Sequence, residues 1–155
     1  MILTEHLTGR LKEILTEGKW VTGTNIKDQI SNLDWRIATK KIYSLNTISD
    51  LVFHLDYYIS GVLNVLEGGK LVIKDKYSFD APPINSELDW IDLVHKFCNN
   101  SEKFIVMISN MSEADLHKTF EKEQYGSYLR NIEAIIEHSY YHFGQIILIK
   151  KMINS

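Results

Sequence analysis

The stretch SYLRNIEAIIEHSYYHFGQIILIKKMI, residues 127–153, decides the fold of this chain. Residues suited to a buried face recur along it at steps of three and four: Tyr128, Ile132, Ile135, Ser139, His142, Ile146 and Ile149. Residues at that spacing share one face of an α-helix, which turns about 100° per residue. The pattern therefore predicts a long amphipathic helix from Ser127 to Ile153.

The predicted buried face of this helix carries two imidazoles, His138 and His142. Because they are four residues apart, their side chains project from adjacent turns in the same direction, as two ligands of one metal ion must. Burying a polar ring without a hydrogen-bond partner or a metal costs about 1–3 kcal/mol. Each ring therefore needs a partner, which a metal ion or another polar group would supply.

Three further stretches with helical spacing predict helices over residues 2–17, 47–67 and 86–109. Thr47 and Ser86 are suitable N-caps, and glycines follow the first two of these stretches. Four long amphipathic helices without sustained period-two alternation predict an all-α bundle. A chain of 155 residues fits one domain, so residues 1–155 are expected to fold as a single unit.

The connection 68–85 lacks helical periodicity and holds both prolines. A connection of this length in a compact domain is usually functional or mobile. Its apolar run Leu71-Val72-Ile73 predicts a short strand. Elsewhere, two large aromatic residues, Trp20 and Trp35, are expected to cover one end of the bundle.

Composition and charge exclude several classes of protein. With a net charge of −3 and no basic stripe, the chain is not expected to bind nucleic acid. Cys98 is the only cysteine, and its place in an apolar helical pattern predicts an inert core thiol. The N-terminus lacks a signal-peptide layout, and no apolar run reaches the ~20 residues of a membrane span. We therefore expect a cytoplasmic protein that does not enter a membrane.

A third histidine, His54, lies midway along the predicted helix 47–67, beside its inner face. Bundled helices pack with axes about 8–10 Å apart, so mid-helix imidazoles on two neighbours can meet at one ion. Three histidines with one open position are typical of a catalytic zinc site, whereas structural sites have four protein ligands, often including cysteine. The residues alone leave two interpretations open: a metal site of His54, His138 and His142, or three histidines with separate partners.

The residues around the histidine pair restrict the kinds of metal site that it could form. The pair is not the HExxH motif of zinc proteases, because a serine follows the first histidine. Glu137 projects about 100° away from its histidine neighbour, so it is expected to be either a solvated residue or one that supports a ligand, and not a ligand itself. Tyr58, Asn131 and Gln145 lie within one or two turns of the histidines and either orient them or are ordinary polar residues of the inner rim. No paired carboxylates stand beside the histidines, so no catalytic acid or base is identified.

Two stretches resemble the DinB-like superfamily of metal-dependent enzymes: LVFHLDYYISGVLNVLEGG, residues 51–69, and IEHSYYHFGQI, residues 136–146. One histidine on the second long helix, followed by HxxxH near the C-terminus, is the signature of that superfamily. The resemblance covers essentially the whole chain. The strings KDKYSFDAPPI, residues 74–84, and EHSYYHFGQI, residues 137–146, are more similar still to one branch of it, whose activity is unassigned.

This resemblance implies a four-helix bundle with up-down-down-up topology, in which the connection 68–85 is the long crossover between helices two and three. It implies a divalent metal, zinc or nickel, on His54, His138 and His142, with water completing the coordination, and commonly a homodimer. Members with assigned activities are chiefly transferases or isomerases that use low-molecular-weight thiols such as bacillithiol, mycothiol or glutathione.

The leading hypothesis is therefore a metal-dependent thiol S-transferase acting on a small-molecule substrate. Its pocket would be roofed by the connection 68–85, with Tyr77, Phe79 and Trp90 as walls. One alternative is a metal-dependent hydrolase, in which the same ion activates water. Another is a non-catalytic dimeric helical bundle that acts as a binding or stress protein, with its metal structural or absent.

Overall fold

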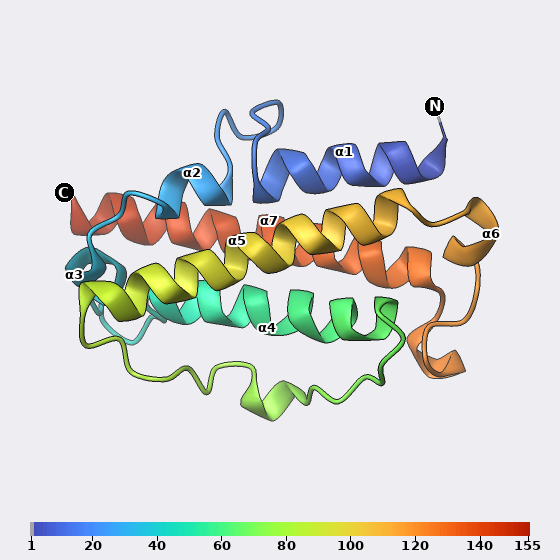
Figure 1. The fold of residues 1–155 in the computed structure, drawn as a ribbon. Coiled ribbons are helices and arrows are strands. Elements are labelled where there is room, and N and C mark those ends of the chain that lie inside the picture. Colours follow the sequence, from blue (N-terminus) through green and yellow to red (C-terminus); the bar gives the residue numbers. More distant parts are fainter. Residues whose placement is uncertain (1) are drawn as a thin grey trace.

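The computed structural model describes residues 2–155, which are all-helical and contain no β-strand (Figure 1). The α-helices are α1 (Leu3–Leu15), α2 (Ile26–Ile30), α3 (Trp35–Ala38), α4 (Ile48–Leu66), α5 (Glu87–Ser109), α6 (Glu113–Leu116) and α7 (Tyr128–Ile153). Two 3₁₀ turns, η1 (Asp75–Tyr77) and η2 (Glu123–Tyr125), lie in the connections. The prediction of an all-α protein is confirmed.

The long helices begin at polar residues that cap their backbone N–H groups. The Thr47 hydroxyl accepts a hydrogen bond from the Asp50 amide, and the Asp50 carboxylate accepts one from the Thr47 amide, so α4 begins with a capping box. Ser86 and Ser127 cap α5 and α7 in the simpler way, each through its hydroxyl. The predicted caps Thr47 and Ser86 are therefore confirmed.

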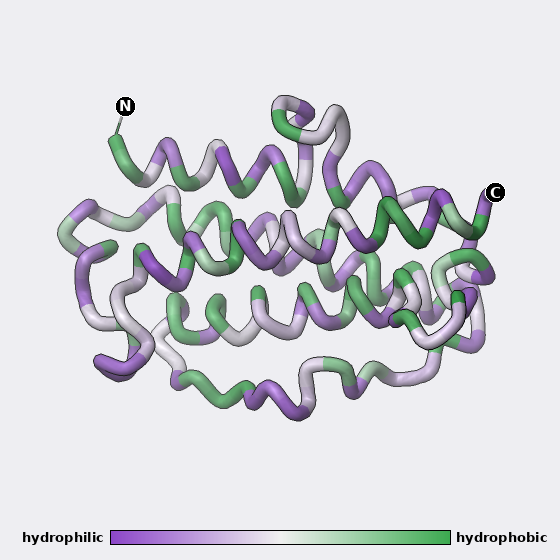
Figure 2. The backbone as a smooth tube through the Cα atoms, turned by 180° about the vertical axis from the view of Figure 1, so that it is seen from behind, coloured by the Kyte–Doolittle hydropathy of each residue, from purple (hydrophilic) through white to green (hydrophobic). Residues whose placement is uncertain are grey.

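The core lies between the four long helices. Helix α4 packs against α5 and α7, and α1 packs against the same two helices. Apolar and polar segments alternate along each long helix in Figure 2, as expected for helices with one buried face. Fully buried side chains, each worth about 1.5–3 kcal/mol of transfer free energy, fill the interior. The largest of them are Phe97, Phe104, Phe120 and Phe143.

The connection between α4 and α5 runs back along the length of α4 (Figure 1). Asn64, near the end of α4, donates from Nδ2 to the carbonyl of Lys70 at 2.7 Å. The Tyr57 hydroxyl donates to the carbonyl of Lys74 at 2.9 Å and accepts from its amide at 2.8 Å. The connection is therefore pinned to successive turns of α4, and it delivers its later residues to the middle of that helix.

The predicted strand at Leu71-Val72-Ile73 is wrong. The backbone groups of neighbouring residues bond to side chains of α4, so no partner strand is needed. Ile73 instead packs over Gly61, where an added Cβ would lie only 2.5 Å from its Cδ1. The glycine thus allows the connection to approach the helix closely.

The two tryptophans expected at one end of the bundle differ in their surroundings. Trp20 is 88% exposed in the connection between α1 and α2, so its predicted covering role is wrong. Trp35 is half-buried against the core, with the Arg36 guanidinium 5.1 Å from its ring centre. Cys98 is buried, and burial raises the pKa of its thiol, as expected for an inert core residue.

No helix within residues 2–155 has the length and apolar character that a membrane crossing requires. This agrees with the sequence, in which no apolar run is long enough.

Candidate metal centre

Helices α4 and α7 bring together the three histidines that the sequence singled out. One ring nitrogen of each of His54, His138 and His142 lies within 4.8 Å of the other two. His138 and His142 come from adjacent turns of α7, and His54 faces them from the middle of α4. His54 and His142 are 6% and 8% exposed, so two of the three rings are almost removed from water. Such a group can hold a metal ion.

The distance between two of the rings fits this role. The Nε2 atoms of His54 and His138 lie 3.0 Å apart. Two nitrogen ligands at about 2.0–2.1 Å from a tetrahedral zinc ion are roughly 3.3–3.4 Å apart. A shift of a few tenths of an ångström would therefore convert the observed contact into a pair of ligands. Without metal, the Nε2–H of His138 donates a hydrogen bond to Nε2 of His54, because the proton of the neutral His54 ring is on Nδ1.

Neighbouring carbonyl groups fix the protonation of two rings. His54 Nδ1 lies 3.1 Å from the backbone oxygen of Ser78, which can only accept, so Nδ1 carries the proton. His142 Nδ1 lies 2.7 Å from Oε1 of Gln145 and carries its proton for the same reason. When these two rings are neutral, Nε2 of His54 and Nε2 of His142 therefore carry no proton. Metal-binding histidines commonly donate their other N–H to a carbonyl or carboxylate in this way.

Burial keeps all three rings neutral near pH 7. It is the main cause that lowers the pKa of each histidine below its usual value, because it disfavours the charged form. The effect is largest for His138, whose pKa falls to about 4 through burial and the neighbouring His142 and His54. A metal needs unprotonated ligands, so the lowered pKa values favour metal binding near neutral pH.

Aromatic rings surround the cluster. Phe79, from the connection, stacks on His54 with ring centres 3.9 Å apart and planes 8° from parallel. The Tyr58 ring lies edge-on to His54 and His138, with ring centres 5.1 and 5.0 Å from its own. Tyr141 lies edge-on to His142 at 4.8 Å and is 66% exposed. These rings restrict water around the ring nitrogens of the three histidines.

The segment Lys74–Phe79, here named the clasp, ties the connection to the cluster. Tyr57 holds it at Lys74, and the Tyr58 hydroxyl donates to Oδ1 of Asp75 at 2.8 Å. The clasp then supplies the Ser78 carbonyl and the Phe79 ring to His54. The position of His54 therefore depends on a segment that lies outside the helices.

Two of the residues predicted to orient the histidines do lie beside them. Gln145 bonds to His142, and Tyr58 contacts two of the rings. Asn131 lies elsewhere: its Nδ2 donates to the carbonyl of Tyr125 in η2 and to that of Ser127, the N-cap of α7. Seven residues of helix separate Asn131 from His138, a rise of roughly 10 Å that its side chain cannot span.

The predicted pocket walls are only partly found at the site. Phe79 contacts His54, as described above. Trp90 is 2% exposed and donates from Nε1 to the carbonyl of Leu33 at 2.9 Å, so it is a core residue near the start of α5. Tyr77 lies in η1, inside the clasp, with its ring 45% exposed and the Lys76 ammonium 4.7 Å from its centre.

Sequence reasoning missed the Ser78 carbonyl and Tyr141. Every residue has a backbone carbonyl, so no sequence pattern could indicate that the carbonyl of Ser78 bonds to a histidine. Tyr141 directly precedes His142 but points outward, and its helical position predicts exposure rather than a role. Glu137 is exposed and forms an ion pair with Arg130 at 3.2 Å, so of its two expected roles the solvated one is found.

Comparison of the chain with protein-family models, curated proteins and solved structures found no match. The function is therefore inferred from the geometry of the site and from the motifs quoted above.

Proposed function

We propose that this chain is a metal-dependent enzyme of the DinB-like superfamily, in which His54, His138 and His142 hold one zinc or nickel ion. The observation that carries the proposal is the convergence of three neutral imidazoles, within 4.8 Å of one another, from two helices. Two of these rings have their Nδ1 protons engaged by carbonyl oxygens. Three separately satisfied histidines would not need to meet in this way.

The donor set favours a catalytic site over a structural one. Three histidines make up the group, and the chain's single cysteine is buried on α5 within the core. Structural zinc sites are normally closed by four protein ligands, whereas three histidines leave a position for water or substrate. An ion bound here would lower the pKa of a thiol or water that occupied this position.

The chain's own residues would orient the ligands and control access. Ser78 and Gln145 hold two rings in the tautomer that a metal requires. Phe79 and Tyr58 cover the rings on the side of the clasp and limit the entry of water. The exposed Tyr141 marks the side on which a small molecule would reach the site.

For the reaction we propose transfer of a low-molecular-weight thiol, such as bacillithiol, to an electrophilic small molecule. Two observations support this reaction: the histidine motifs resemble those of the DinB-like superfamily, and the three histidines leave one position open on a bound ion. The experiment incubates metal-loaded protein with a panel of electrophiles, with and without thiol, beside the His138→Ala variant. Product that requires both thiol and His138 supports the proposal. Turnover without thiol indicates a hydrolase, and absence of turnover in a metal-loaded protein indicates a non-catalytic metalloprotein.

We also propose that α1, α4, α5 and α7 form an up-down-down-up four-helix bundle. The return of the α4–α5 connection along α4 supports this, because it lets α5 begin beside the start of α4.

A homodimer is proposed as well. Leu148 and Met152 of α7 share one face at helical spacing and are 58% and 36% exposed. Light scattering of wild type and Leu148→Glu tests it, since only the wild type should dimerise.

A further inference from the structure

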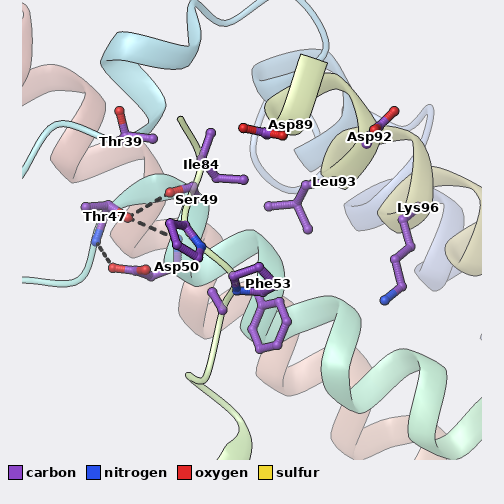
Figure 3. A pocket seen from close by; sticks show the side chains of 13 residues that line it. Thr39, Thr47, Ser49, Asp50, Phe53, Ile84, Asp89, Asp92, Leu93 and Lys96 are labelled. Atoms are coloured by element: carbon purple, nitrogen blue, oxygen red, sulfur yellow. Dashed lines mark hydrogen bonds between the residues drawn. The ribbon is translucent and has the colours of Figure 1, made fainter. Parts of the chain in front are cut away.

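A second feature, unrelated to the histidines, is a hollow between the first turns of α4 and α5. It has a volume of about 440 Å³ and is closed on one side by residues 81–84 of the connection. Figure 3 shows Leu93 of α5 and Ile84 extending into it, with Phe53 of α4 below. None of the three histidines lines it. Sites for small ligands typically have volumes of about 300–1,000 Å³, so the size suits one.

The floor of the hollow is apolar. Phe53, Ile84 and Leu93 are half-buried, and Pro82 and Pro83 add apolar surface from the connection. The prolines also have no N–H that would need a partner, and they limit the backbone motion of the closing segment. The hollow therefore offers a preformed apolar surface to the flat or branched body of a ligand.

The rim carries three carboxylates and one ammonium group. Asp89 and Asp92 lie along α5, and Asp50 lies at the start of α4 (Figure 3). The single lysine, Lys96, pairs at 3.8 Å with the buried carboxylate of Asp56, on the far side of the rim from Asp50. Hydrogen bonds from Asn85 and Ser86 lower the pKa of Asp89, so it stays ionised near neutral pH.

The two helix N-termini at the hollow oppose this negative charge only in part. Each contributes the equivalent of about half a positive charge. Asp50 and Asp89 accept hydrogen bonds from backbone amides there and offset these dipoles. Asp92 is an exposed residue one turn into α5, and it keeps the rim net negative.

We propose that this hollow binds a small organic cation: an ammonium group attached to an apolar body. The apolar body would lie on Phe53, Ile84 and Leu93, and the ammonium group would face the carboxylate rim. This site is distinct from the proposed metal centre and does not depend on it.

The test uses phenethylammonium as probe, with 2-phenylethanol as its neutral isostere and 3-phenylpropionate as its anion. Titration followed by NMR on the full chain should shift the resonances of Ala81, Ile84 and Leu93. The cation should bind about two- to fivefold tighter than the alcohol at low salt, as expected for one exposed ion pair, and this preference should shrink with salt. The anion should bind most weakly.

Two variants and a control make the test decisive. Asp92→Asn should remove most of the preference for the cation while leaving the alcohol unaffected. Glu5→Gln, an equal change of charge on the exposed face of α1, should change neither. Leu93→Phe should weaken all three probes by filling the hollow. Equal binding of cation and alcohol, or no shift of the lining resonances at millimolar probe, would overturn the proposal.

Discussion

The Nε2 atoms of His54 and His138 lie 3.0 Å apart, although 84 residues separate them along the chain. Two imidazoles at this distance cannot both be charged, since like charges in a site of low dielectric constant repel strongly. In the metal-free protein both rings are neutral and one N–H···N hydrogen bond joins them, and a metal ion would take the place of the shared hydrogen. Protonation of these rings should therefore affect both the free energy of unfolding and the affinity for a metal ion.

The first prediction concerns acid stability of the metal-free protein. The pKa of His138 is about 4 in the folded chain and about 6.5 when unfolded, so the unfolded chain binds more protons between these values. The free energy of unfolding should therefore fall as the pH is lowered through this window. For this partly exposed ring we expect a loss on the order of 1–2 kcal/mol. Urea denaturation in chelator at pH 7 and pH 4.5 measures it.

The matched variants are His138→Gln and His117→Gln, the latter at an exposed position beyond α6. The His138 variant should show a flatter dependence of unfolding free energy on pH between these two values. The His117 variant should behave as wild type. Identical slopes for all three proteins would mean that His138 titrates normally and that the buried cluster does not form in solution.

A second prediction distinguishes Gln145 from Asn131. Gln145 holds the Nδ1 proton of His142, so Gln145→Leu should weaken zinc binding by about 10–100-fold, the usual effect of losing a partner of a metal ligand. Asn131→Leu removes an amide that bonds only to the carbonyls of Tyr125 and Ser127, away from the histidines, and should leave zinc affinity unchanged. Competition with a fluorescent chelator measures both. Equal losses in the two variants would contradict the orientation assigned to His142.

A third prediction tests the clasp. The double variant Tyr57→Phe/Tyr58→Phe removes the hydroxyls that hold Lys74 and Asp75, bonds worth about 0.5–1.5 kcal/mol each. Tryptic cleavage within residues 70–76 should accelerate by about tenfold or more as local opening becomes easier. Zinc affinity should fall as well, because the Ser78 carbonyl no longer holds His54. Tyr43→Phe, at a residue 88% exposed, is the control and should alter neither property.

A fourth prediction separates an open metal site from a structural one. The apolar core packs without the metal centre, so chelation should leave the helical circular dichroism signal intact at 25 °C. Loss of a ligand held at 100 times its Kd costs about 2.7 kcal/mol, which lowers Tm by roughly 5–10 °C in a chain of this size. Collapse of the helical signal on chelation would instead indicate a structural metal. The triple histidine variant should not respond to chelator at all.

The long helices could be predicted because their signals are local. The apolar spacing of residues 127–153 and the caps Thr47 and Ser86 determine where helices lie, and observed and predicted bounds agree within about two residues. The pairing of His138 with His142 follows from the same spacing. That His54 lies beside this pair depends on how α4 packs against α7, which no local spacing encodes. Its position midway along α4, together with the motif resemblance, nevertheless indicated that it would join the pair.

The irregular connection could not be predicted in this way. Its backbone groups bond to side chains of α4, an arrangement with no period in the sequence, so the apolar run 71–73 predicts a strand that does not form. The same connection supplies the Ser78 carbonyl, whose role depends on backbone position and not on residue type. An aromatic residue near a helix start, such as Trp90, suits either a core or a pocket, and only its burial and its hydrogen bond to the Leu33 carbonyl show that it is a core residue.

The most direct test of the central claim is the metal content of purified, untagged protein, measured by elemental analysis beside the His54→Ala/His138→Ala/His142→Ala variant. We predict about one zinc or nickel ion per chain in the wild type and none in the folded variant, as three ligands of a single ion require. Folded wild-type protein without metal, or a variant that retains the same amount of metal, would contradict the assignment of the three histidines as its ligands.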